Sequence, residues 1–585
     1  MNKFITHPGL VLLLPYLKGH AWAFFWGFWL LALTNLTAAA IPYVMKHATD
    51  AITRHESVVP FVILLLGLAG LIVLLRIRGR THVFQIGRQV EFDLRRDYHN
   101  HLLQLDATYY DQARTGELVF RGTNDVLAIR MFIGPGFLQV SNTAMAYAIT
   151  LPVMITMDPW LTLIALSPYP LVMLLARLLT KHLFRLSRQA ADRFGELTSL
   201  VQESLVGMAV IRNHGQEKAR LNLFENQLDR LHHSHSRHTN LQSLYNPLMM
   251  FGGGASTLLV VYYGGTLVAQ GQLTVGDFVA FSGYLALLIM PTIALGWIIT
   301  VIQRGLVGLD RLELLLKVPK GVPLVEANKG VARQGNLEVR QLSFAYPVKG
   351  EQAGKNILEN VSMEVQAGQF VGLVGKVGCG KSTLLHVLAK LYPVPDGTIF
   401  LDGEDINALA EEDIRATLAM APQESLLFSL SVEENLLYGL NQGDSQLAWS
   451  LAKQVSLEEE IRRFPQQMQT LVGEKGITLS GGQRQRVALA RALAMQAPVL
   501  LLDDIFASVD ARTEAAILNA LMQDHTTTVI MVCHRVAALH QADIIHVMDE
   551  GRIIAQGNHA QLMAECSLYQ ELHNRMARAQ ALEEL

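Results

Sequence analysis

The stretch that decides the fold of the second half of the chain is Phe370-Val-Gly-Leu-Val374 followed by Gly375-Lys-Val-Gly-Cys-Gly-Lys-Ser-Thr383. A short apolar strand runs into a glycine-rich loop and then into a helical pattern, which is the setting of a phosphate-binding loop. Glycines let backbone N–H groups close around phosphate oxygens, and the helix N-terminus adds a partial positive charge. We expect Lys381 to reach the β- and γ-phosphates of a nucleotide and Ser382 to coordinate Mg²⁺. The predicted nucleotide-binding residues of the loop are Gly375, Gly378, Cys379, Gly380, Lys381, Ser382 and Thr383.

Four further residues complete a set that suits nucleotide binding. Asp503 ends the apolar run that starts at Val499, and a carboxylate at the end of a buried strand is typical of residues that hold Mg²⁺. Gln423 and His534 are expected to meet the γ-phosphate or the attacking water, and Gln423 also to join the Mg²⁺ shell. Tyr346 offers a flat face on which adenine can stack. Taken singly, Gln423 and His534 are more simply explained as ordinary surface or core residues.

The composition excludes several classes of protein. The chain has 585 residues, of which 17% are charged and 50% are hydrophobic, so it is not a disordered protein, which needs low hydrophobicity and high charge. The formal net charge of −3 argues against a nucleic acid or another polyanion as partner. Cys379, Cys533 and Cys566 are an odd number confined to the second half, which is no disulfide framework and indicates that this half is cytosolic.

The first half has the pattern of a membrane domain. A bilayer core about 30 Å thick needs about 20 mostly apolar residues to be spanned by a helix. Several long stretches, such as 21–44 and 131–157, contain no Asp, Glu, Lys or Arg. A buried helix of a soluble protein explains any one such stretch, but not six together. We predict six retained spans in a lipid bilayer, at about 21–44, 58–75, 132–157, 159–179, 244–269 and 278–302.

The distribution of basic residues predicts the orientation. Residues 76–130, between spans two and three, hold nine arginines, and residues 180–242, between spans four and five, are similarly basic. We expect the chain to lie in the plasma (bacterial inner) membrane. These basic segments then lie on the cytoplasmic side, as do the N-terminus and everything after span six. We expect them to be long helical extensions of the spans, with helices lying flat on the membrane as the alternative. The predicted parts are a multi-pass transmembrane domain over 1–318, a linker over 319–335 and a cytoplasmic nucleotide-binding domain over 336–585.

A second loop gives the nucleotide-binding half a family resemblance. Leu479-Ser480-Gly481-Gly482-Gln483 resembles the signature of ATP-binding-cassette (ABC) ATPases. The resemblance runs in the family's order from Tyr346 to His534, and it includes the phosphate loop, Gln423, the signature, Asp503 and Ala507-Ser-Val-Asp510. The first half is similar to an exporter-type membrane domain at Tyr109-Tyr110, Thr115-Gly116-Glu117, Asn124-Asp125 and Gln202-Glu203-Ser204. The chain is thus identified as a member of the ABC exporters: a multidrug-type half-transporter with six membrane helices fused to one α/β P-loop cassette.

The resemblance implies an activity and a dimer. It implies an ATPase that uses ATP with Mg²⁺ to drive transport across a membrane. In the family's fold, the signature loop serves a nucleotide held by the phosphate loop of the partner chain. The segments around 109–116 and 207–212 are expected to contact a cassette. The signature residues expected to bind the partner's ATP are Ser480, Gly481, Gly482 and Gln483.

One residue departs from the family's pattern. After Asp503 the family has Glu, the carboxylate that polarises the attacking water, and here the residue is Asp504. Its arm is one methylene shorter, and a displacement of about 1 Å costs on the order of 100-fold in rate. A site that uses Asp504, His534 and Gln423 for catalysis is therefore expected to bind ATP well and to cleave it slowly. The pattern resembles the degenerate-site subunit of a heterodimeric exporter whose partner supplies the Glu, and a slow homodimer is the alternative.

The spans contain few ionisable residues, which favours an amphipathic or apolar cargo such as a drug, a lipid or a lipophilic peptide. We expect a cavity without fixed charge, with Arg177 snorkelling toward the membrane surface. Four polar residues of the spans either line that cavity or join helices, namely Asn35, Gln139, Asn142 and Gln303. The alternatives to export are an importer of a metal-chelate ligand and a membrane-anchored regulatory protein that binds ATP.

A run of histidines stands in the second basic segment. His232, His235 and His238 share one face of a predicted helix, so the spacing permits a metal site. No carboxylate or thiol accompanies them, and a solvated helix face is the simpler interpretation.

Overall fold

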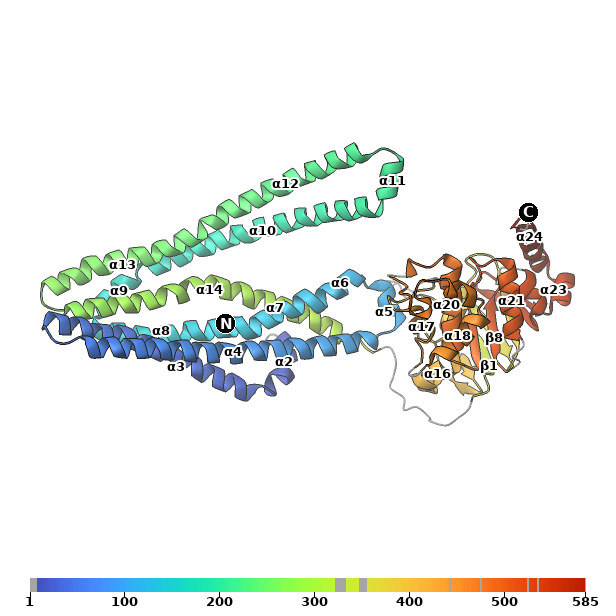
Figure 1. Ribbon diagram of the computed structural model, residues 1–585, viewed down its shortest axis with the longest axis horizontal. Coiled ribbons are helices and arrows are strands. Elements are labelled where there is room, and N and C mark those ends of the chain that lie inside the picture. The colour runs from blue at the N-terminus through green and yellow to red at the C-terminus, as the bar shows by residue number, and fades with distance from the viewer. Residues whose placement is uncertain are drawn as a thin grey trace. The chain divides into compact units, whose positions relative to one another are not determined.

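The computed structural model describes residues 8–320, 333–346, 355–440, 443–473, 476–522, 526–533 and 536–583. The chain forms two compact units, each of which is described by itself (Figure 1). One unit comprises Met1–Asn100 and Gly116–Lys317, and the other comprises His101–Thr115 and Val318–Leu585. A short segment of the first half therefore belongs to the unit that holds the nucleotide-binding residues.

Six helical stretches of the described chain are long and apolar enough to cross a membrane, as predicted. In hydrocarbon every backbone N–H and C=O needs a partner, and a helix satisfies both groups within one apolar run. Only 6% of the apolar window of the second stretch is buried, so its side chains face outward, toward lipid or a partner. The stretches are α3 (Ala21–Thr53), α4 (Val59–Leu103), α6 to α8 (Thr115–Phe120, Val126–Met131 and Phe137–Met157), α9 with α10 (Pro159–Leu166 and Pro168–Val206), α13 (Tyr245–Ala269) and α14 (Val275–Leu316).

Several of these helices are far longer than a membrane is thick. α4 has 45 residues and α14 has 42. At a rise of 1.5 Å per residue each exceeds about 60 Å, twice the ~30 Å of a hydrocarbon core. Figure 1 shows α10 and α12 (Glu217–Ser243) running side by side to the short helix α11 (Met208–Asn213). The two basic segments of the sequence lie along these long helices.

Two sheets form the frame of the second unit. The larger has the order β10-β9-β3-β8-β7-β6, in which all neighbours are parallel except β10 and β9. Its central strand β3 (Phe370–Gly375) is buried at every residue, as the unbroken apolar run predicts. The remaining strands of this sheet are β6 (Leu418–Ala421), β7 (Val499–Leu502), β8 (Thr528–Val532), β9 (Ile544–Asp549) and β10 (Arg552–Gly557). An antiparallel sheet of order β2-β1-β4-β5 holds β1 (Leu337–Phe344), β2 (Leu358–Val365), β4 (Ile399–Leu401) and β5 (Glu404–Asp405).

Helices surround the larger sheet and carry the functional loops. α15 (Lys381–Leu388) follows β3 directly, so the loop between them lies at the carboxyl end of the parallel strands, where α/β sheets bind their ligands. α20 (Gly481–Ala494) begins within the signature and packs against β6. Two short helices, α17 (Val432–Leu436) and α18 (Ser445–Gln454), pack on α20, a third, α19 (Glu458–Arg462), packs on α18, and the buried apolar residues of this part are continuous with the sheet. The C-terminal part holds α21 (Ala511–Met522), α22 (Val536–Gln541), α23 (His559–Glu565) and α24 (Ser567–Glu583).

Candidate functional site

The phosphate loop turns tightly between β3 and α15. Gly378 and Gly380 have φ of 81° and 102°, in the left-handed region that glycine tolerates best. A Cβ on Gly375 would lie 2.3 Å from the carbonyl oxygen of Met548, so no larger residue fits where the strand ends. The loop therefore keeps its backbone N–H groups free of side-chain cover, and Val377 at its tip is 97% exposed. This is the cradle that a polyphosphate needs.

Lys381 is held over this cradle from the first turn of α15. Its side chain is 7% exposed, and its Nζ donates to the carbonyl oxygens of Gly375 and Lys376 at 2.9 Å each. The Sγ of Cys379 lies 3.7 Å from the same Nζ. A buried ammonium that is satisfied only by carbonyl oxygens gains when an anion takes their place. The loop and Lys381 together fit the phosphate tail of a nucleotide.

Two oxygens suited to Mg²⁺ meet beside the loop. Ser382, on α15, donates from its Oγ to Oδ1 of Asp503 at 2.9 Å. Asp503 follows β7 and is 2% exposed, and its backbone N–H donates to Ala421 at the end of β6. A hydroxyl and a buried carboxylate are hard oxygen donors of the kind that Mg²⁺ takes together with phosphate oxygens. The pair therefore fits this ion, and it joins residues 121 positions apart.

Asp504 and Gln423 are brought together next to that pair. The parallel register of β6 and β7 places the loops after Ala421 and Leu502 at one edge of the sheet. There the Nε2 of the exposed Gln423 donates to Oδ2 of Asp504 at 3.3 Å. Asp504 has φ of 45°, a left-handed conformation that Asp adopts more readily than most residues. Gln423 thus contacts the carboxylate proposed for catalysis through its amide nitrogen.

Tyr346 lies on the other side of the loop. Its hydroxyl donates to Oγ1 of Thr383 at 3.2 Å, and its ring packs edge-on against the rings of Phe344 and Tyr392. The side chain is half-buried. The aromatic residue predicted for adenine is therefore attached directly to the helix that follows the phosphate loop. His534, the remaining predicted catalytic residue, lies outside the described residues.

The signature forms the start of α20. Ser480 caps the helix: its Oγ accepts from the backbone N–H of Gln483, and the Gln483 side chain accepts from the N–H of Ser480. Gln483 in turn donates to Glu460 at 2.6 Å. Gly482 sits so close to Ser508 that a Cβ would approach the Ser508 carbonyl to 2.5 Å. Ser480 is exposed, and among the residues that the structure describes no hydrogen bond joins the signature to the phosphate loop of the same chain. The tip of α20 is thus free for a ligand held elsewhere.

Comparisons with known proteins agree with this geometry. The model of the ABC transporter transmembrane region matches residues 24–292, and that of the ABC transporter domain matches residues 358–507. The chain is 33% identical over 82% of its length, and 82% of the relative's, to the probable multidrug resistance ABC transporter ATP-binding/permease protein YheI of Bacillus subtilis. It is 31% identical over 93% of its length, and 92% of the relative's, to the multidrug resistance-like ATP-binding protein MdlA of Escherichia coli.

The chain belongs to the ABC transporter family. It is also 32% identical, over 85% of its length and 82% of the relative's, to the ATP-dependent lipid A-core flippase of Aromatoleum aromaticum. A solved bacterial Atm1-family ABC exporter with ATP bound superposes with a TM-score of 0.77 at 26% identity, covering 95% of this chain and 98% of that one. The predicted fold, membrane helices followed by an ATP-binding cassette, is confirmed, and so is the assignment to ABC-type ATPases coupled to transport.

The membrane unit of the transporter contains a cavity of about 740 Å³ between α3, α4, α8 and α14, lined by both apolar and polar residues. Asn35 and Asn142 both line it, and the Nδ2 of Asn35 donates to Oδ1 of Asn142 at 3.1 Å. Gln139 also lines it, whereas Gln303 is not among its lining residues. Arg76 and Arg80, both exposed on α4, line the same space. The prediction of a cavity without fixed charge is therefore wrong, because α4 carries its basic residues into the wall.

A chain of contacts joins the nucleotide site of the transporter to α5 (Ala107–Gln112), in the segment expected to contact a cassette, partly through residues that the sequence analysis did not name. The hydroxyl of Tyr392 donates to Oδ2 of Asp111 at 2.8 Å, and burial together with this bond raises the pKa of Tyr392. The ring of Tyr392 packs on Tyr346 with centroids 5.2 Å apart, and Tyr346 reaches Thr383. Ala107 packs against the same core. The residues expected around 109–116 thus contact the cassette through Asp111, 281 positions away from Tyr392.

The helix-spaced histidines of α12 are not brought together as ligands. His232, His233 and His235 are exposed, and the rings of the first two lie 6.1 Å apart. Within the described part of the chain, another group, His540, His559 and His573, brings ligand atoms within reach of one ion. Their positions in the sequence follow no regular spacing, so the pattern gave no signal.

Proposed function

We propose that this chain is one half of a dimeric ABC exporter that moves amphipathic molecules carrying an anionic group out across the bacterial inner membrane. The observation that carries the cargo proposal is the cavity wall, which contains both Arg76 with Arg80 and the apolar Met290 and Trp297. A volume of about 740 Å³ is in the range that holds drug-sized ligands. Relatives named as multidrug and lipid A-core transporters are in keeping with a cargo that has apolar and polar parts.

The orientation follows from charge. Arginine-rich residues 76–130 and the basic residues 180–242 would remain on the cytoplasmic side, together with the N-terminus and the cassette. ATP is then available to the cassette from the cytoplasm. The basic wall of the cavity begins where the apolar run of α4 ends, so it would receive an anionic head group from the inner leaflet.

Pairing of two cassettes is supported by apolar side chains that are exposed beside the functional loops of one cassette. ABC exporters work as dimers in the membrane. Val377 in the phosphate loop is 97% exposed and Ile477, just before the signature, is 80% exposed. Apolar side chains beside a functional loop favour an interface. We propose that Ser480 and the N–H groups of Gly481 and Gly482 bind the nucleotide held by the partner's phosphate loop.

We further propose that the partner is a different half-transporter that has Glu after its Walker-B Asp. Asp504 keeps the charge of the usual Glu with a shorter arm, while the signature of this chain is intact. In such a pair, this chain's own pocket would bind ATP tightly and hydrolyse it slowly, and its Ser480 would complete the faster site. A slow homodimer remains the second reading, and import of a chelate ligand is disfavoured by the multidrug and lipid relatives.

The residues of the site have distinct tasks in this proposal. Lys381 and the loop N–H groups bind and orient the phosphates, and Ser382 with Asp503 would hold Mg²⁺, which supplies charge neutralisation for phosphoryl transfer. Gln423 and Asp504 face the water that attacks. Movement of the loop would reach α5 through Thr383, Tyr346, Tyr392 and Asp111.

Transport by the full chain, with any co-purifying partner, tests the cargo. In inside-out vesicles we expect ATP-dependent uptake of an anionic amphiphile to exceed that of a neutral analogue with the same alkyl chain. The double variant Arg76→Ala, Arg80→Ala should lower the uptake of the anionic cargo about tenfold and leave the uptake of the neutral analogue unchanged. The reason is that a hydrogen bond to a charged group is worth about 1.5–3 kcal/mol. Arg78→Ala on the same helix is the matched control, since Arg78 does not line the cavity. Equal effects of both variants would contradict the cargo proposal.

The partner is tested separately. Purification of this chain from its native membrane should bring down a second half-transporter with Glu after its Walker-B Asp. Recovery of this chain alone as a homodimer, with rapid ATP hydrolysis that Asp504→Ala abolishes, would refute the asymmetric pair while leaving the cargo proposal untouched.

A further inference from the structure

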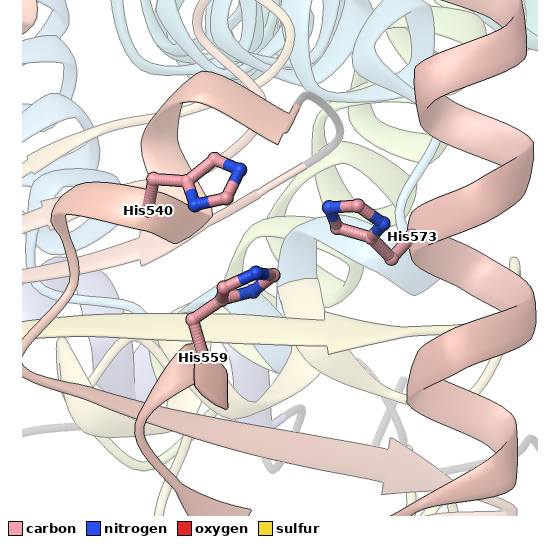
Figure 2. Close-up of side chains that lie close together, drawn as sticks. All are labelled: His540, His559 and His573. Carbon is pink, nitrogen blue, oxygen red and sulfur yellow. The ribbon is translucent and has the colours of Figure 1, made fainter. Parts of the chain in front are cut away.

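Three histidines from separate elements meet at the C-terminal end of the cassette. His540 lies on α22, His559 is the first residue of α23, and His573 lies on α24. Figure 2 shows the three rings turned toward one space, and one nitrogen of each lies within 4.8 Å of the others. The ring centroids of His540 and His559 are 4.2 Å apart, and those of His559 and His573 are 5.1 Å apart. All three histidines follow His534, the last of the predicted nucleotide-site residues in the sequence, and none of them belongs to that predicted set.

One member of this cluster, His573, has ring nitrogens without hydrogen-bond partners among the described residues. Both ring nitrogens of His573 are buried and make no hydrogen bond to any residue that the structure describes. Buried polar atoms nearly always find a partner, and leaving one unpaired costs about 1–3 kcal/mol. No Asp or Glu belongs to the described cluster, so no carboxylate compensates a charged imidazole there. The lone pair of a neutral His573 ring is therefore available to bind a metal ion.

His559 is already oriented as a metal ligand would be. Its Nδ1 lies 2.8 Å from the hydroxyl of Tyr569, which is fully buried on α24. With the proton on Nδ1, His559 donates to Tyr569, and its Nε2 lone pair is left for a ligand bond. Metal-binding histidines characteristically make such a second hydrogen bond, which fixes the tautomer and the ring.

We propose that His540, His559 and His573 bind one divalent transition-metal ion of the zinc class. Three imidazoles are a known ligand set for Zn²⁺, which then keeps a fourth position for water or another donor. The same donors suit Co²⁺, Ni²⁺ and Cu²⁺, whereas Mg²⁺ and Ca²⁺ prefer oxygen. The site is therefore chemically separate from the oxygen pair of Ser382 and Asp503.

The present geometry closes on an ion with small movements. Nitrogens bound to a tetrahedral Zn²⁺ at 2.0–2.1 Å lie about 3.3 Å apart, against a separation of up to 4.8 Å here. His540 is exposed and its ring is free to rotate inward. A bound ion would join α24 to α22 and α23, and so fix the last helix of the chain to the helix that follows β8.

Metal binding by the full chain tests the proposal. The protein is purified with an affinity tag that contains no histidine, stripped with a chelator, and titrated with Co²⁺ and then with Zn²⁺. We expect one equivalent per chain with the visible absorption of tetrahedral Co²⁺, its loss on adding Zn²⁺, and no effect of Mg²⁺ or Ca²⁺. Zn²⁺ should also raise the thermal unfolding temperature of the cassette.

Variants identify the ligands. His540→Ala and His573→Ala should abolish the Co²⁺ spectrum and the thermal shift, and His540, being exposed, is not needed for folding. Tyr569→Phe should keep the stoichiometry and weaken affinity by about 10- to 100-fold, which is the usual effect of losing the outer hydrogen bond of a ligand. His233→Ala, exposed on α12, is the matched control and should change nothing.

Several results would overturn the site. An apoprotein that takes up no Co²⁺ or Zn²⁺ refutes it, and so does unchanged binding by His540→Ala. Loss of binding in His233→Ala instead would assign any uptake to the surface histidines of α12. Because ATP and cargo enter none of these measurements, their outcome is independent of the proposed export function.

Discussion

Replacing Asp504 by Glu should turn a slow ATPase into a fast one. The substitution lengthens the carboxylate arm by one carbon–carbon bond, about 1.5 Å. The surrounding groups are already in place: Gln423 reaches Asp504 at 3.3 Å and Ser382 reaches Asp503 at 2.9 Å. A misplacement of about 1 Å costs on the order of 100-fold, or about 2.7 kcal/mol of transition-state stabilisation. We therefore expect Asp504→Glu to raise the ATPase rate of this chain alone by about 100-fold.

The assay is steady-state phosphate release from the full chain in nanodiscs at saturating ATP and Mg²⁺. Asp504→Asn, which keeps the size and removes the charge, should be slower than the natural chain, and Lys381→Ala on the Glu background should abolish the gain. Binding of a fluorescent ATP analogue should be the same for Asp and Glu. If the natural chain already turns over rapidly and Glu raises the rate less than threefold, the shorter arm is not limiting and the reasoning fails.

Three other perturbations test separate parts of the transporter. Ser480→Arg on the Asp504→Glu background should lower ATPase about 100-fold while ATP binding persists, because a donor to the partner's phosphate is replaced by a bulky side chain; an undiminished rate would refute the shared site. Tyr392→Phe removes the bond to Asp111, worth about 1 kcal/mol at a half-buried site, so transport per ATP should fall roughly fivefold with the KM for ATP unchanged; an unchanged ratio would exclude this route. Burial lowers the pKa of His546 from 6.5 to about 4, so the folded cassette takes up its proton later than the unfolded chain as pH falls. The contribution of His546 to the free energy of unfolding is therefore complete above about pH 6.5 and falls by about 3 kcal/mol toward pH 4. Thermal unfolding of the natural chain and of His546→Leu at several pH values would measure it. Equal dependence of the two unfolding temperatures on pH would contradict the prediction.

The sequence predicted what depends on local pattern. Six uncharged runs predicted six membrane helices, because a single apolar run in hydrocarbon can satisfy its own backbone N–H and C=O groups by forming a helix. The strand ending at Gly375 and the helix starting at Lys381 followed from glycines that must take left-handed φ or leave space. The pairing of Ser382 with Asp503 was implied by the family's motifs, since both residues follow the carboxyl ends of strands in the same sheet.

What the sequence could not predict depends on tertiary register. Asp111 and Tyr392 are 281 residues apart and neither belongs to a motif, so their hydrogen bond has no local signal. The three histidines meet only because α22, α23 and α24 pack together. Arg76 and Arg80 stand at the end of an apolar run, where either an aqueous extension or a cavity wall fits the pattern, and only the packing of α4 decides between them.

The membership of His101–Thr115 in the same unit as the cassette has a practical consequence for anyone who isolates that half. A fragment cut after the last membrane helix would lack Ala107, which covers part of the core, and Asp111, which satisfies the hydroxyl of Tyr392. The truncated protein would present a bare apolar hollow around Leu391 and Pro393. The solubility and nucleotide turnover of this fragment would then reflect the newly exposed apolar surface. A grafted peptide spanning residues 101–115 would be needed to cover that surface again.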